Sequence, residues 1–114
     1  MEYRVCRNNP APYNDLNGKI SLLGLGTMRL PLRDAADQTS IDEEKAQEIF
    51  DYAYAHGVNY FDTAYPYHGG MSEKFCGKAL AKYPRASYHL ASKLPGWLLK
   101  CDEDVLRIFN EQLA

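Results

Sequence analysis

The chain contains 114 residues, 46% hydrophobic and 25% charged, with a formal net charge of -2. This composition is ordinary for a globular domain and excludes collagen-like, coiled-coil and disordered chains. No apolar stretch approaches the roughly 20 residues of a membrane span, and the polar residues 1–9 lack the apolar region of a signal peptide. We therefore expect a cytoplasmic protein with no membrane partner. Thirteen Lys and Arg against 15 Asp and Glu indicate no basic surface for nucleic acid.

The cysteines and the domain organisation are simple. Cys6, Cys76 and Cys101 are widely spaced and form no Cys-x-x-Cys pair, so we predict reduced thiols, no disulfide framework and no metal site. No repeat, low-complexity tract or linker divides residues 1–114, and we interpret them as one unit.

In chain order, predicted strands alternate with predicted helices. Residues 5–6 and 20–23 flank a turn-rich connection and suggest a β-hairpin, and the glycine-bounded run 22–27 suggests a buried strand. Ser40 and Glu43 have the spacing of a capping box at the start of a helix, and Gly57 is its C-terminal stop. The apolar residues of this helix that share one face are Ala46, Ile49, Phe50, Ala53 and Tyr54.

The same alternation continues to the end of the chain. We predict a strand at 58–63, a loop over 65–71, a helix near 72–82 with Ser72 as its N-cap and Pro84 beyond its end, and a strand at 87–92. The inner face of that helix comprises Phe75, Cys76, Ala79 and Leu80. Asp102 is a candidate cap for a third helix, with an apolar stripe at Val105, Ile108, Phe109 and Leu113. This order indicates right-handed β-α-β units and a parallel sheet.

Three polar residues fall where the predicted strands end, which is where parallel α/β folds gather functional side chains. Asp62 ends one strand, Tyr67 follows in the next loop, and Lys93 ends the next strand, so the three side chains can converge. Tyrosine ordinarily loses its proton near pH 10, and a neighbouring ammonium favours the phenolate. Tyr67 would then be a general acid tuned by Lys93, with Asp62 orienting Lys93. Position alone leaves structural alternatives open. Asp62 could cap the next turn, Tyr67 could be an ordinary member of the chain's nine tyrosines, and Lys93 could be a solvated surface lysine.

Longer motifs around these residues resemble the aldo/keto reductase family. They are Leu-Gly-Leu-Gly-Thr-Met-Arg-Leu-Pro at 23–31, Gly-Val-Asn-Tyr-Phe-Asp-Thr-Ala-Tyr-Pro-Tyr-His-Gly-Gly-Met-Ser-Glu at 57–73, Phe-Cys-Gly-Lys-Ala-Leu at 75–80 and Ala-Ser-Lys-Leu-Pro at 91–95. They occur in family order over nearly the whole chain. The Tyr-His-Gly-Gly loop looks like a bacterial branch whose longer members append an iron–sulfur region, and nothing in this sequence shows that region.

The resemblance implies a (β/α)8 barrel preceded by a hairpin that closes its bottom, with hydride transfer between NADPH and a small carbonyl substrate. It places three members of the family's Asp, Tyr, Lys and His tetrad on Asp62, Tyr67 and Lys93. The family's His ends a fourth strand, so we expect the N-terminal part of the barrel, truncated after about three β-α units. The residues implied for contact with the nicotinamide end of the cofactor are Gly26, Thr27, Met28 and Asp62.

The histidines and the rival functions complete these expectations. We expect His68 to be an exposed loop residue and His56 to be structural, and we do not assume that His89 replaces the tetrad His.

The 114-residue chain alone is expected to be inactive. A truncated inactive fragment and a non-catalytic partner-binding relative stay open, because a three-stranded parallel sheet leaves unpaired edges. A doubly wound nucleotide-binding domain is disfavoured, because no Gly-x-Gly-x-x-Gly opens a helix after the first strand.

Overall fold

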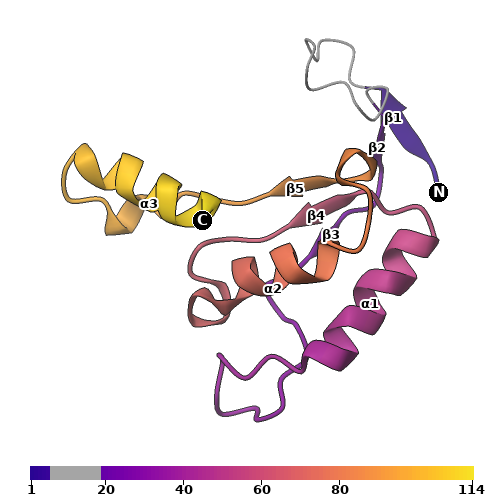
Figure 1. The fold of residues 1–114 in the computed structure, drawn as a ribbon, viewed down its shortest axis with the longest axis horizontal. Coiled ribbons are helices and arrows are strands. Elements are labelled where there is room, and N and C mark those ends of the chain that lie inside the picture. The colour runs from indigo at the N-terminus through magenta and orange to yellow at the C-terminus, as the bar shows by residue number, and fades with distance from the viewer. Residues whose placement is uncertain (6–18) are drawn as a thin grey trace.

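Two small sheets form the framework of the fold (Figure 1). The computed structural model describes residues 1–5 and 19–114. Strands β1 (Tyr3–Val5) and β2 (Lys19–Ser21) form an antiparallel pair, and β3 (Leu25–Gly26), β4 (Tyr60–Asp62) and β5 (His89–Ala91) form a parallel sheet in that order. The predicted hairpin and parallel sheet are confirmed, although each strand is shorter than predicted or shifted. Cys6 and the predicted connection after it lie outside the described residues.

The hairpin covers the N-terminal end of the parallel sheet. The side-chain oxygen of Asn59 accepts a hydrogen bond from the Ser21 amide at 2.8 Å, and the Ser21 hydroxyl accepts one from the Asn59 amide at 3.1 Å. The Asn59 side-chain amide also donates to the carbonyl oxygen of Lys19 at 3.2 Å. Because Asn59 directly precedes β4, these bonds attach the hairpin at the opposite end of the strand from Asp62.

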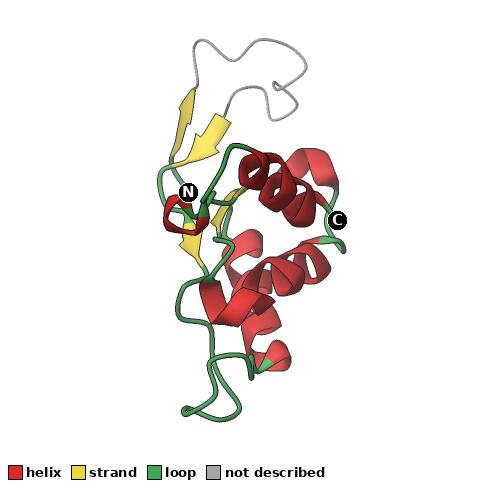
Figure 2. Cartoon of the chain, turned by 90° about the vertical axis from the view of Figure 1, so that its left-hand side faces the viewer, coloured by secondary structure: helices red, strands yellow, loops and turns green. Residues whose placement is uncertain are grey.

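Helices α1 (Glu43–Ala55) and α2 (Met71–Leu80) pack beside the sheet, and Figure 2 shows most helical residues on one side of the strands. Phe50 of α1 stacks on Phe61 of β4 with ring centres 5.3 Å apart and meets Phe75 of α2 edge-on at 5.5 Å. These three rings are buried and form the centre of the core. Successive strand residues point to opposite faces, so Phe61 faces the helices while Tyr60 and Asp62 face the other way.

The start of α1 differs from the predicted capping box. Asp42 is the N-cap, and its Oδ1 accepts a hydrogen bond from the Lys45 amide at 3.3 Å. The Ser40 hydroxyl instead donates to the carbonyl oxygen of Asp37 at 2.7 Å, within the preceding turn, and is not available to the helix. Ile49, predicted on the buried face, is 41% exposed. It lies on the flank of α1 beside Leu23, and no helix among the described residues covers this flank.

The start of α2 also differs from its prediction. Gly70 is the N-cap, in the left-handed conformation with φ 87°, so Ser72 lies within the first helical turn. The short 3-10 helix η1 (Tyr67–Gly70) occupies most of the predicted loop. The inner face of α2 is confirmed, because all of its predicted members are buried: Phe75, Cys76, Ala79 and Leu80.

Helix α3 (Glu103–Leu113) is set apart from α1 and α2 in Figure 1. Asp102 is its N-cap residue but makes no capping bond through its side chain; Asp104 instead accepts a hydrogen bond from the Lys100 amide at 2.9 Å. Of the predicted apolar stripe only Ile108 is buried, while Phe109 is 52% exposed. The radius of gyration is 15.2 Å, against about 13 Å for an ordinary compact domain of this length. No helix among residues 1–5 and 19–114 is long and apolar enough to cross a membrane.

Candidate active site

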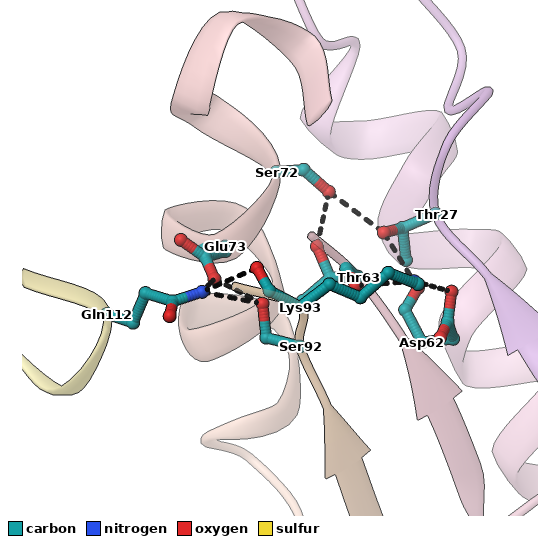
Figure 3. Close-up of polar contacts among 8 residues, drawn as sticks. All are labelled: Thr27, Asp62, Thr63, Ser72, Glu73, Ser92, Lys93 and Gln112. Atoms are coloured by element: carbon teal, nitrogen blue, oxygen red, sulfur yellow. Dashed lines mark hydrogen bonds and ion pairs between the residues drawn. The ribbon is translucent and has the colours of Figure 1, made fainter. Parts of the chain in front are cut away.

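Asp62 and Lys93 meet at the C-terminal ends of two adjacent strands (Figure 3). Strand β4 ends at Asp62, which pairs with Ala91 at the end of β5, and Lys93 follows two residues later. The ammonium nitrogen of Lys93 is 2.6 Å from Oδ1 of Asp62 and donates a second hydrogen bond to the carbonyl oxygen of Thr63 at 2.9 Å. The two charged side chains are 49% and 35% exposed, so the pair is accessible from solvent.

Tyr67 completes the predicted group of three. It opens η1, immediately after the loop that leaves β4, and it is half-buried. The ammonium nitrogen of Lys93 lies 5.0 Å from the centre of the Tyr67 ring, within the range of a cation–π contact. The structure therefore brings Asp62, Tyr67 and Lys93 together at the strand ends, as the sequence predicts.

Opposing effects act on the pKa of Lys93. Partial burial alone would lower it, whereas the hydrogen bond to the Asp62 carboxylate, the charge of that carboxylate and the neighbouring Tyr67 side chain raise it. The raising effects outweigh burial, and the pKa of Lys93 lies above its usual 10.5. Lys93 is therefore a fixed cation beside a phenol throughout the neutral pH range.

Three buried hydroxyl groups, here called the hydroxyl cluster, support the strand ends from below. They belong to Thr27 after β3, Thr63 after β4 and Ser72 in α2, and each residue is at most 1% exposed. The Ser72 oxygen lies 2.9 Å from each threonine hydroxyl, and Thr27 donates to the carbonyl oxygen of Asp62 at 3.0 Å. The cluster thus fixes the backbone on both sides of Asp62. The sequence pattern predicts Ser72 as a helix cap and gives no sign of its buried contacts with the two threonines.

A second set of polar contacts holds the backbone at Lys93 (Figure 3). The side-chain nitrogen of Gln112 in α3 donates to Oε1 of Glu73 at 2.6 Å. Its second hydrogen lies between the Ser92 hydroxyl oxygen at 3.1 Å and the carbonyl oxygen of Lys93 at 3.2 Å. Ser92 in turn donates to the Glu73 carboxylate. No sequence pattern indicates these contacts, because Gln112 is one polar residue among many on α3 and its partners are about 20 or more positions away.

The residues expected to meet a cofactor surround the end of β3. Gly26 pairs with Asp62 across the sheet, and a Cβ atom built on it would meet no other atom within 4 Å, so packing within the described chain does not explain this glycine. Met28 is 61% exposed beside it. Bare backbone, an exposed thioether and the Asp62 carboxylate suit a planar ring that carries a carboxamide, so these residues fit a nicotinamide. Thr27 is fully buried, and its hydroxyl and amide both donate to the carbonyl oxygen of Asp62, so its contact with a cofactor stays a prediction.

The three histidines lie in η1, at the C-cap of α1 and in β5. His68, expected to be exposed, is 5% exposed because its ring turns inward and contacts backbone groups. His56 is the C-cap of α1, and its Nδ1 is 2.7 Å from the carbonyl oxygen of Tyr52. His89 pairs with Tyr60, two residues before the strand ends. Among the described residues no group of three or more His, Cys, Asp and Glu could hold a metal ion.

Known proteins resemble this chain along most of its length. The sequence model of the Aldo/keto reductase family matches residues 22–113. A protein of Schizosaccharomyces pombe with the provisional name aryl-alcohol dehydrogenase is 35% identical over 96 residues, covering 82% of this chain and 26% of that protein. An aldo-keto reductase of Metarhizium robertsii is 49% identical over 55 residues, covering 46% of this chain and 15% of that protein.

A solved structure also resembles the fold. It is the crystal structure of a thermostable aldo-keto reductase in complex with the inhibitor epalrestat, and it matches with a TM-score of 0.68 at 28% identity. The match covers 99% of this chain and 38% of that chain. The chain therefore spans between 15% and 26% of the length of these two curated relatives, and somewhat more of the solved structure.

Proposed function

The chain belongs to the aldo/keto reductase family, and on this premise we propose that it carries the proton-transfer group of an NADP-dependent oxidoreductase that reduces a small carbonyl compound. The observation that carries the proposal is the contact of Lys93 with both Asp62 and Tyr67 at the ends of parallel strands. In the proposal residues 1–114 form the N-terminal part of a (β/α)8 barrel domain. They act in the cytoplasm, where the free thiols Cys76 and Cys101 stay reduced.

In the proposed reaction Tyr67 is the general acid. Its hydroxyl donates a proton to the carbonyl oxygen of the substrate, and the ammonium of Lys93 stabilises the phenolate that remains. Asp62 and the carbonyl oxygen of Thr63 hold Lys93 in place. When bound, NADPH supplies the hydride that adds to the carbonyl carbon.

The cofactor would be held at the end of β3. Gly26 leaves open space for the nicotinamide ring, Met28 offers an apolar contact, and Asp62 offers an acceptor for a carboxamide N–H. Thr27 supports this edge from within, because both of its hydrogen bonds to the Asp62 carbonyl oxygen fix the backbone between the two strands.

A chimaera tests the proposal: residues 22–113 replace the matching segment of the thermostable aldo-keto reductase. We expect the chimaera to oxidise NADPH in the presence of an aromatic aldehyde. The loss of absorbance at 340 nm measures this oxidation. Lys93→Met should lower kcat by about 100-fold or more, the lower end of what a positioned proton donor contributes. Lys100→Met, at an exposed lysine beyond the site, is the matched control and should leave kcat unchanged. A folded chimaera without turnover, or with equal turnover in both variants, contradicts the proposal.

The 114-residue chain assayed by itself should show no reduction, because only three members of the family's tetrad match residues of this chain. Measurable turnover would contradict that part of the proposal.

A second candidate function is the binding of a protein partner without catalysis. It is favoured by apolar side chains on α3 that the described residues leave uncovered, with Leu106, Phe109 and Leu113 at 66%, 52% and 70% exposure. Size-exclusion chromatography distinguishes the two: self-association that Phe109→Asp abolishes would support the second candidate, and a monomer with an active chimaera would exclude it.

A further inference from the structure

His68 has an unusual backbone conformation directly after Tyr67. It is the one non-glycine residue with positive φ in the part of the chain that the structure describes, at φ 53° and ψ 42°. Gly69 and Gly70 continue the turn with φ 60° and 87°. Residues with a Cβ rarely adopt this conformation, and they keep it only where their surroundings fix it. The conformation turns the His68 ring into the protein, where it is 5% exposed.

The buried ring contacts two segments that are distant in the sequence. Nδ1 is 3.0 Å from the carbonyl oxygen of Gln38, and Nε2 is 3.2 Å from the amide nitrogen of Leu30. A carbonyl oxygen only accepts and an amide only donates, so a neutral ring with its proton on Nδ1 forms both hydrogen bonds. The carbonyl oxygen of Thr27 is also 3.1 Å from Nε2. A proton on Nε2 would bond Thr27 but leave the Leu30 amide without its acceptor.

Residues 27–30 form a short bridge with both ends anchored. Thr27 is fully buried and belongs to the hydroxyl cluster through its contact with Ser72. Leu30 is 6% exposed, and its amide donates a hydrogen bond to His68. Met28, between them, is 61% exposed and next to Gly26 at the strand end. The position of Met28 therefore depends on the anchor at each end, and His68 provides the one at Leu30.

We infer that His68 is a positioning residue: its Nδ1-protonated imidazole ties residues 27–30 to the turn that begins with Tyr67. The contact of His68 with residues 27–30 thereby connects Met28, proposed to meet the nicotinamide, to Tyr67, the proposed proton donor. In this respect the inference rests on the proposed function. The side chain itself touches no substrate, because the protein covers it.

The first test uses the wild-type 114-residue chain with ¹⁵N labelling. Long-range ¹H–¹⁵N correlation spectra report which ring nitrogen of each histidine carries the proton. We expect the Nδ1–H form for His68, together with slow hydrogen exchange at the Leu30 amide. An Nε2–H form, or free exchange at Leu30, would overturn the inference without any substitution being made.

Substitutions separate a local anchor from general stabilisation. In His68→Asn, the new residue tolerates the left-handed conformation but is too short to reach Leu30. We expect Leu30 exchange to accelerate at least tenfold while amides within α2 keep their rates. His68→Gln offers an amide oxygen near the position of Nε2 and should partly restore the protection of Leu30. His56→Asn, at an exposed histidine, is the control and should leave Leu30 unchanged. Unchanged Leu30 exchange in His68→Asn would overturn the inference.

An NADPH titration distinguishes this inference from the proposed function. With ¹³C-methyl methionine, NADPH should shift the Met28 signal in the wild type and require at least a threefold higher concentration in His68→Asn. If NADPH shifts Met28 equally in both proteins while Leu30 exchange differs, the tie to the cofactor is wrong. If it does not shift Met28 in either, the proposed cofactor site is wrong, and the exchange of Leu30 alone decides the role of His68.

Discussion

Replacing Ser72 with alanine tests whether the hydroxyl cluster stabilises the strand ends below Asp62. The substitution removes one oxygen that lies 2.9 Å from Thr27 Oγ1 and 2.9 Å from Thr63 Oγ1. Thr27 keeps its hydrogen bond to the carbonyl oxygen of Asp62. Thr63 Oγ1 loses its bond to Ser72, in a residue that is 1% exposed, so water cannot readily replace the lost partner.

The expected loss follows from this difference between the two threonines. Leaving one buried hydroxyl without a partner costs about 1–3 kcal/mol. Denaturant slopes for small proteins are about 1–3 kcal/mol per molar urea, so the unfolding midpoint should fall by roughly 1 M. Ser87→Ala makes the same chemical change at a site that also has two hydrogen bonds, to Tyr54 and Pro84, but lies nearer the surface. There we expect a change within about 0.5 kcal/mol.

Urea unfolding followed by far-ultraviolet circular dichroism measures both variants. Trp97 is 75% exposed, so its fluorescence is a poor reporter of unfolding. If Ser72→Ala and Ser87→Ala have equal effects, burial does not decide the contribution of these hydroxyls, and the account of the hydroxyl cluster is wrong.

Three further predictions concern charge and packing. Asp62→Asn should lower the pKa of Lys93, because it removes the charged acceptor that raises it; NMR titration of the lysine side chain measures this, and an unchanged pKa would exclude Asp62 as a cause. Phe50→Ala should lower the free energy of unfolding by about 3–5 kcal/mol, since its fully buried ring contacts two others; a loss below that of Ser72→Ala would contradict the core described above. Hydrogen bonds, chiefly from Lys82, lower the pKa of Asp51 from 3.8 to about 2. Its stabilisation is therefore present above pH 3.8 and lost as the pH falls towards 2, and Asp51→Asn should show a shallower acid loss in unfolding measurements from pH 5 to 2.

The alternation of strands and helices could be predicted because it depends on spacing along the chain. The buried faces of α1 and α2 repeat every three to four residues, and Phe50 and Phe75 lie where that period places them. The residues at which the helices start are harder to predict, because capping depends on which donor a side chain reaches. Ser40 has the spacing of a cap but bonds within its own turn, and Asp42 caps the helix instead.

The candidate site divides in the same way. The meeting of Asp62 and Lys93 can be predicted, because the ends of parallel strands bring them together whatever the details of packing. The prediction that His68 is exposed is wrong, because a loop position normally implies exposure and the left-handed backbone at His68 instead turns its ring inward. The contact of Gln112 with Glu73 cannot be predicted from the sequence, since the position of α3 relative to α2 depends on three-dimensional packing and not on local sequence.

The most direct test of the central claim, that Tyr67 is the proton donor, is the kcat of Tyr67→Phe in the chimaera. Tyr65→Phe is the matched control, because the Tyr65 hydroxyl donates to Glu111 at 2.7 Å and lies outside the Lys93 contacts. The account predicts that Tyr67→Phe lowers kcat by about 100-fold or more while NADPH still binds, and that Tyr65→Phe leaves kcat within about twofold. Undiminished turnover in Tyr67→Phe would contradict it.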